Sequence, residues 1–293
     1  MNFQFTKKIY IMKKSNYIFT LLLIFTATSL FAQNSTSSKD YRNFKKYFDK
    51  PSIEVSYGLS EIRLNGNSYG LANAGMIEMK LGFTSQSQSR YGNSILNYKN
   101  RFLFLSNASS DNYSSSNNPG TFNNLWRFGL GNKEGFGIKL GSLSLMPYSS
   151  NSIAWSEISY PVTSESASEN SALADFNNAF RFGTTTEAGI NLQLAPGFSI
   201  QPKYEISDIF PRHLFGKQMM SSVIEISGLY LIDGFTKIIM RNTPVAGTFV
   251  NFILKNAYEY GFYQLRKNQM YWPFTSVAPL RYNTFKLGMM FTF

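Results

Sequence analysis

The sequence predicts an all-β membrane fold, an antiparallel transmembrane β-barrel of about eight strands with a helical insert before the last one. Three observations predict it. Many short segments alternate apolar and polar side chains, the chain begins with an export signal, and it ends on a strand with one apolar face. Side chains of a strand alternate with period two. In a membrane barrel the apolar set therefore faces lipid while the lumen stays polar.

The first 32 residues predict a cleaved signal peptide. Two lysines precede an apolar run over residues 17–31, and the small residue Ala32 follows. A basic region, a short apolar region and a cleavage site with a small residue form the pattern of a secretory signal peptide. The run is shorter than the roughly 20 residues that a spanning helix needs. Its Leu-Phe-Ala-Gln ending resembles signal peptides of Bacteroidota, which are Gram-negative bacteria. Residues 33–50 are expected to form a periplasmic leader and residues 51–293 the barrel.

Composition excludes several classes of function. The absence of cysteine excludes disulfides, a lipid-anchored N-terminal cysteine and thiolate metal sites. His213 is the only histidine, so a metal site with several imidazole ligands is also excluded, and we expect no cofactor. Removal of the four lysines in residues 1–32 lowers the net charge from +11 to about +7. Such a charge is typical of nucleic-acid binding, which we exclude because the chain is exported and its basic residues are dispersed.

Alternation identifies the strands in order. The first segment, residues 52–60, places Ile53 and Val55 on the apolar face and Glu54 on the other. The eight segments are 52–60, 75–85, 96–105, 125–131, 135–141, 178–194, 198–206 and 283–293. An even count is typical of bacterial single-chain barrels. Residues 143–148 and 153–161 are an alternative hairpin that would raise the count to ten or more.

The connections predict the same topology. Asn132–Glu134 and Ala195–Gly197 contain turn-forming residues and are expected to be tight periplasmic turns. The connections on the other side are long: residues 61–74, 107–124, 142–177 and 207–282. Short turns on the inside and long loops on the outside are the bacterial barrel pattern.

The insert over residues 207–281 reads as two helices. Thr243 followed by Pro244 is a favourable helix start, and a run over residues 212–240 precedes it. Polar residues recur near helical spacing in the second helix: Thr248, Asn251, Lys255, Glu259 and Arg266. Charged residues interrupt both helices, so neither is expected to span a membrane. We expect a helical pair that caps or plugs the barrel mouth, or lies in the outer headgroup zone.

The last segment presents one apolar face, formed by Phe285, Leu287, Met289, Phe291 and Phe293. It resembles the C-terminal signal of bacterial outer-membrane β-barrels, a final strand of alternating apolar residues with an aromatic last residue. The resemblance implies location in the outer membrane and handling by the barrel assembly machinery. It is architectural and covers about two-thirds of the chain, with the helical insert as a departure from the simplest eight-stranded members.

Charged residues on the polar faces are expected to line the lumen. They are Glu54, Glu78, Lys80, Lys99, Arg101, Arg127, Lys139, Arg181, Glu187, Lys203, Glu205 and Lys286. A barrel of eight strands is filled by its side chains and leaves no open channel. Unpaired charge in a water-poor lumen is costly, so the basic surplus requires water, an acidic plug residue or a bound anion as a partner.

Basic residues of the insert are candidates for contact with lipopolysaccharide phosphates, because arginine and lysine form charge-assisted bonds to phosphate. They are Arg212, Lys217, Arg241, Lys255 and Lys267. An alternative partner is the acidic loop that contains Glu157, Glu165, Glu169 and Asp175. Outer-membrane lipids and lipopolysaccharide are the expected partners.

Three functions remain open. The first is a non-enzymatic outer-membrane barrel whose outer loops and helical insert form a binding or assembly surface. The second is a narrow porin-like channel for small, anionic solutes. The third is a lipid-modifying enzyme that uses His213 with a serine, because a base must reach the hydroxyl by hydrogen bond. The serines Ser221 and Ser222 lie two helical turns or more from it in the sequence.

Overall fold

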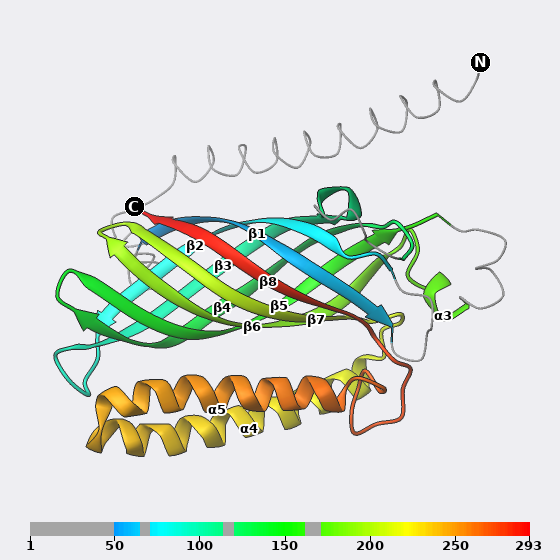
Figure 1. Cartoon of the computed structure of the whole chain (residues 1–293). Coiled ribbons are helices and arrows are strands. Elements are labelled where there is room, and N and C mark those ends of the chain that lie inside the picture. Colours follow the sequence, from blue (N-terminus) through cyan, green and yellow to red (C-terminus); the bar gives the residue numbers. More distant parts are fainter. Residues whose placement is uncertain (1–49, 65–70, 114–119, 162–170) are drawn as a thin grey trace, which may run out of the picture. The chain divides into compact units, whose positions relative to one another are not determined.

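The computed structural model describes residues 50–64, 71–113, 120–161 and 171–293. The signal peptide and nearly all of the leader lie outside these described residues. In the described part of the chain, eight strands form one closed sheet in which each strand is antiparallel to its neighbours and β8 pairs with β1 (Figure 1). The strands are β1 (Lys50–Leu64), β2 (Ala74–Gln88), β3 (Ile95–Ser109), β4 (Asn124–Leu140), β5 (Leu143–Ser159), β6 (Phe180–Ala195), β7 (Phe198–Ile209) and β8 (Leu280–Thr292). The predicted barrel, its number of strands and the helical insert are confirmed.

The two ends of the barrel differ. At the short-turn end, where β1 begins and β8 ends, the strands are joined by residues 89–94, 141–142 and 196–197. At the long-loop end they are joined by residues 65–73, 110–123, 160–179 and 210–279. The long-loop connections include a 3-10 turn, η1 (Ser110–Asn112), and a short helix, α3 (Ser171–Ala174). The expected asymmetry of short and long connections is present.

Two of the strands predicted from the sequence form a single strand in the structure. Residues 125–131 and 135–141 both belong to β4, so the predicted turn at Asn132–Glu134 is wrong. The count is restored by β5, a single strand over residues that the main prediction assigns to a loop and the alternative assigns to the two strands of a hairpin, so both assignments are wrong there. The count of eight was therefore right although two assignments were wrong. Asn132, Lys133 and Glu134 pair in register with both β3 and β5 in the middle of the sheet.

The β3 strand faces the opposite way from our prediction. Phe102 and Phe104 point into the lumen and are 5% exposed, whereas Arg101 lies on the outer wall. The lumen has room for the two rings because glycines face them from β4. A Cβ at Gly129 would lie 2.7 Å from the ring of Phe104, and one at Gly131 would lie 2.8 Å from the ring of Phe102.

An apolar layer closes the lumen at the long-loop end. Inward side chains from seven strands meet there with Leu173 and Phe176, which belong to or follow α3. The strand residues in this layer are Ile62, Ala74, Met76, Ala108, Leu125, Ile158, Ile209, Leu280 and Tyr282. These side chains are at most 2% exposed. Their burial excludes water from this end of the barrel.

The two helices of the insert, α4 (Phe215–Asn242) and α5 (Pro244–Leu265), form a hairpin that lies against the outside of the barrel wall. The Tyr263 hydroxyl donates to Thr184 on β6 over 3.1 Å, near the long-loop end. Met240, at the hairpin's turn, packs against Ile95 and Ile138 at the short-turn end. The hairpin therefore runs along the wall (Figure 1). Of the expected locations, the plug and the cap of the barrel mouth are wrong. Among the described helices, none is both long and apolar enough to cross a membrane.

Candidate functional site

The middle of the lumen holds a cluster of nine charged side chains, here called the lumen cluster. Its basic members are Lys80, Arg127, Lys133, Lys203 and Lys286, and its acidic members are Glu54, Glu78, Glu187 and Glu205. None is more than 4% exposed. Five positive and four negative charges leave the cluster with a formal charge of +1. Such deep burial is tolerated only when every charge has a close partner.

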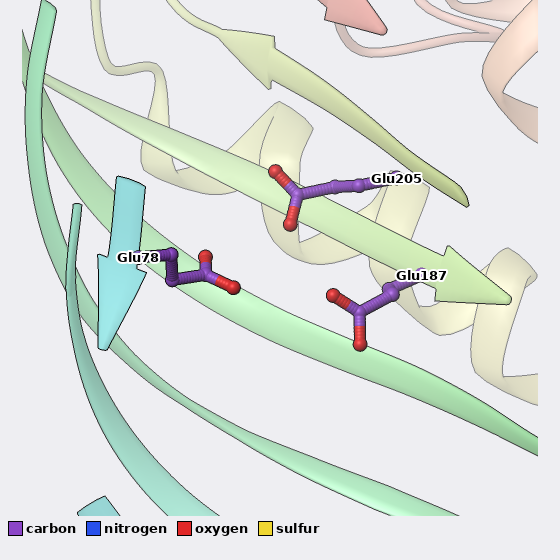
Figure 2. Close-up of side chains that lie close together, drawn as sticks. All are labelled: Glu78, Glu187 and Glu205. Carbon is purple, nitrogen blue, oxygen red and sulfur yellow. The ribbon is translucent and has the colours of Figure 1, made fainter. Parts of the chain in front are cut away.

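Lys286 lies at the centre of the cluster. Its Nζ lies 2.8 Å from Glu78 Oε1 and 3.0 Å from Glu187 Oε2, and it also contacts Glu205 Oε2. These three glutamates come from β2, β6 and β7 and point toward one another across the lumen (Figure 2). One ammonium group therefore joins carboxylates from three different strands to β8.

The three glutamates also form an arrangement of the kind that binds a metal ion. One carboxylate oxygen from each lies within 4.8 Å of the others. However, the Lys286 ammonium donates to Glu78 and Glu205, forms an ion pair with Glu187 and has the positive charge that a metal would supply. The geometry is therefore that of an internal ion-pair centre whose cation belongs to the chain.

The remaining members are also paired. The Glu54 carboxylate accepts from both Lys133 and Lys203. Arg127 donates to Glu205 over 2.8 Å. Aromatic faces supply further partners, because cations are attracted to ring faces: the Lys80 Nζ lies 4.5 Å from the Phe102 centroid, and the Arg127 guanidinium lies 4.6 Å from that of Tyr282. The Phe102 contact exists only because β3 turns its aromatic face inward.

Eight of the predicted lumen residues lie in this cluster, and four do not. Lys99 and Arg101 are exposed on the outer wall, because β3 is inverted. Lys139 is exposed near the short-turn end of β4, beyond the buried part of the lumen. Arg181 is half-buried at the long-loop end of β6 and lines a groove of about 720 Å³ beside α4. The prediction missed Lys133, which had been assigned to a turn.

The predicted anion contacts lie in different environments. Lys255 is buried, and its Nζ lies 3.0 Å from Glu134 and 2.8 Å from Asp233, so it is not available to an anion. Lys217 is exposed and donates to the Thr275 carbonyl over 2.7 Å. Arg212, Arg241 and Lys267 are exposed. Of the acidic loop, Glu165 and Glu169 lie outside the described residues.

His213 has no serine partner within the described residues. Its ring contacts Phe182 edge-on, with 5.2 Å between centroids, and lies 6.3 Å from Phe215. The Ser221 hydroxyl donates instead to the Trp272 carbonyl over 2.7 Å. The base-to-hydroxyl hydrogen bond that nucleophilic catalysis requires is not formed here.

The final strand shows its apolar residues on the outside. Phe285, Leu287, Met289 and Phe291 are exposed on the outer wall, and Phe293 follows β8. Lys286, between two of them, faces the lumen. This strand thus presents an apolar outer face while it supplies the central cation of the lumen cluster.

Comparisons with known proteins give structural neighbours only. No protein-family model matches the chain, and no curated protein matches it. It is similar to the crystal structure of Neisserial surface protein A (NspA), at 10% identity and a TM-score of 0.40 over 83% of this chain and 97% of that one. It is also similar to Ail, the attachment invasion locus protein of Yersinia pestis, at 9% identity and a TM-score of 0.32 over 83% and 98%. The closed sheet of eight antiparallel strands, apolar outside and charged inside, has the fold of a bacterial outer-membrane β-barrel.

Proposed function

We propose that this chain is a non-enzymatic integral protein of the outer membrane that acts through its outside surfaces, the long loops and the α4–α5 hairpin. One observation carries the proposal. The lumen, where a channel would conduct, is filled by nine paired charges that are at most 4% exposed. The apolar layer at the long-loop end lies in series with that cluster. A solute that crossed the barrel would have to disrupt both the lumen cluster and the apolar layer.

The placement in the membrane is supported by the outer wall. Large apolar side chains stand exposed on neighbouring strands, such as Val55 on β1, Met79 on β2 and Leu287 on β8. Surfaces of this kind are stable against acyl chains and costly against water. Export through a cleaved signal peptide, and recognition of the final strand by the barrel assembly machinery, are parts of the same proposal.

Two measurements on the refolded protein test it. In planar bilayers we expect no stepwise ion conductance, because the lumen cluster and the apolar layer block the bore; reproducible anion-selective currents would establish the channel instead. Incubation with outer-membrane lipids should leave their mass spectra unchanged. A lipid product that disappears in His213→Ala would establish the enzyme. Heat-modifiable migration on gels shows that each preparation contains the folded barrel.

A further inference from the structure

The α4–α5 hairpin has its polar side turned inward, the reverse of a helix on a soluble protein. The polar residues of α5 that recur at helical spacing are buried: Thr248, Asn251, Lys255 and Glu259 are at most 7% exposed. Arg266, just after the helix, is 2% exposed. The large apolar residues of the same helices stand outside. Leu231, in the middle of α4, is 77% exposed.

Each buried charge of the hairpin has a partner within the hairpin or on the wall. Arg266 pairs with Glu225 on α4 over 2.9 Å. Lys255 bridges Asp233 on α4 and Glu134 on β4. The Asn151 amide of β5 donates to the Glu259 carboxylate over 2.8 Å. Each of these buried charges therefore has at least one partner on the protein, although the Glu259 Oε2 and Arg266 Nε atoms have no hydrogen-bond partner among the described residues.

The wall beneath α5 is polar, unlike the outer wall on β1 and β8. The positions of β4, β5 and β6 that face away from the lumen cluster there are Asn132, Glu134, Ser149, Asn151, Thr184 and Thr186. Ser149 and Thr186 are buried although they point outward. The hairpin contacts this strip at Glu134, Asn151 and Thr184, although Asn132 and Asn151 remain exposed beside it. Along these contacts lipid would meet the hairpin's outer side in place of the polar wall.

The outer side of the hairpin is apolar over its length and basic at its ends. Fifteen large apolar side chains are exposed on it, ten on α4 and five on α5. Its exposed charges are Lys217 at one end and Lys237 and Arg241 at the other. Twenty residues separate the two lysines, which is about 30 Å along a helix and about the thickness of the hydrocarbon core. Long basic side chains near the ends of a membrane segment reach the headgroups.

We propose that the outer side of the α4–α5 hairpin lies in the acyl chains of the membrane and completes the apolar belt of the barrel where the wall itself is polar. The occupant of this surface is lipid hydrocarbon, with anionic headgroups at the basic ends. Neither helix has the mean hydropathy of a spanning helix, because the polar residues that lower it face the wall and one another. This inference rests on the proposed membrane location of the barrel.

Single cysteines test the proposal cleanly, because the chain has none of its own. Leu231→Cys places a thiol at the middle of α4, Leu287→Cys places one on the barrel belt, and Lys267→Cys places one on an exposed site just after α5. Each full-length variant is refolded into vesicles and treated with a membrane-impermeant maleimide. Each is also labelled with a fluorophore whose emission brominated acyl chains quench.

We expect Leu231→Cys to behave as Leu287→Cys does. Its reaction with maleimide should be at least about tenfold slower than that of Lys267→Cys, because thiolate formation is disfavoured in apolar surroundings, and brominated chains should quench its label. Rapid reaction at Leu231→Cys with protection at Leu287→Cys overturns the inference alone. Rapid reaction at both overturns the membrane location as well. Protection from both reagents would show that another protein surface covers the hairpin, and this too overturns the inference.

Discussion

Replacing Lys286 by methionine tests whether the stability of the lumen cluster depends on the geometry of its ion pairs or on its net charge. Methionine keeps a chain of similar length and removes the ammonium. The formal charge of the cluster falls from +1 to 0, so an account based on net charge predicts little harm. The geometry predicts the opposite, because Glu78, Glu187 and Glu205 lose one shared cation at once. Removal of one partner from a buried ion group costs about 3–5 kcal/mol.

Urea unfolding of the refolded protein, followed by tryptophan fluorescence, measures this change. The free energy of unfolding is the midpoint multiplied by the slope. Lys139→Met is the matched control, since Lys139 is exposed near the end of β4, and we expect it to stay within about 0.5 kcal/mol of wild type. A Lys286→Met protein within about 1 kcal/mol of wild type would refute the reasoning from geometry.

A double variant separates the lost ion pairs from lost packing. In Lys286→Met with Glu205→Gln, one of the stranded carboxylates is also neutralised. The Glu205→Gln change introduces an amide whose oxygen can still accept from Arg127, which donates to Glu205 over 2.8 Å in the wild type. We expect the double variant to lose less free energy of unfolding than the two single variants lose in sum, because groups in one network do not act additively. Additive losses would mean that Lys286 acts through packing alone.

Four further variants extend the argument to other parts of the fold. Lys133→Met should lower the free energy of unfolding by about 3–5 kcal/mol, whereas a lysine in an exposed turn would change it by less than about 0.5 kcal/mol. Gly228→Ala should speed hydrogen exchange in α4, because its Cβ would lie 2.2 Å from Tyr258; Gly234→Ala meets nothing within 4 Å and should stabilise the helix by about 0.5–1 kcal/mol. Lys255→Met should speed hydrogen exchange in α5, because two carboxylates lose their partner.

Each of these changes has a result that would contradict it. Equal exchange rates in the two glycine variants would mean that α4 and α5 are not packed as closely as the Tyr258 contact requires. For the Lys255→Met variant, the control is Lys237→Met, because Lys237 is exposed near the same end of the hairpin. If both variants loosen α5 alike, the buried bridge to β4 is not what holds the hairpin.

The sequence predicts the barrel well because lipid imposes a simple rule on most strands. Where one side of a strand faces acyl chains and the other a polar lumen, alternation is clean, as in β1, β2 and β8. Eight lumen charges were found from that alternation alone. The rule fails for β3, whose inward side is aromatic. Lys80 lies 4.5 Å from the Phe102 centroid, and this pairing of a cation with a ring across strands has no signature within either strand.

The location of the hairpin was not predictable from its own residues. Thr243 and Pro244 marked the start of α5, and the helix begins at Pro244. The sequence predicts the spacing of the polar residues of α5 correctly, but it places their helix at the barrel mouth or in the outer headgroup zone. A polar stripe indicates only that one side of a helix meets polar groups. Whether these belong to water, to a lumen or to an outer wall depends on partners such as Glu134 and Asn151, which lie more than 100 residues away.

The missed strand and the misplaced hairpin have one physical cause. A helix pair with a polar side is unstable beside lipid unless the wall offers polar partners, and a polar wall is unstable there unless something covers it. Where the hairpin lies, strands are therefore polar on both sides: Asn132 and Glu134 are on the outer wall, where Glu134 contacts Lys255 of α5, while Lys133 faces the lumen. Such a stretch loses its alternation and looks like a turn. An apparent turn in one part of a barrel sequence and a polar stripe on an otherwise apolar helix in another thus predict each other, and a search for the two together would have joined the two halves of β4.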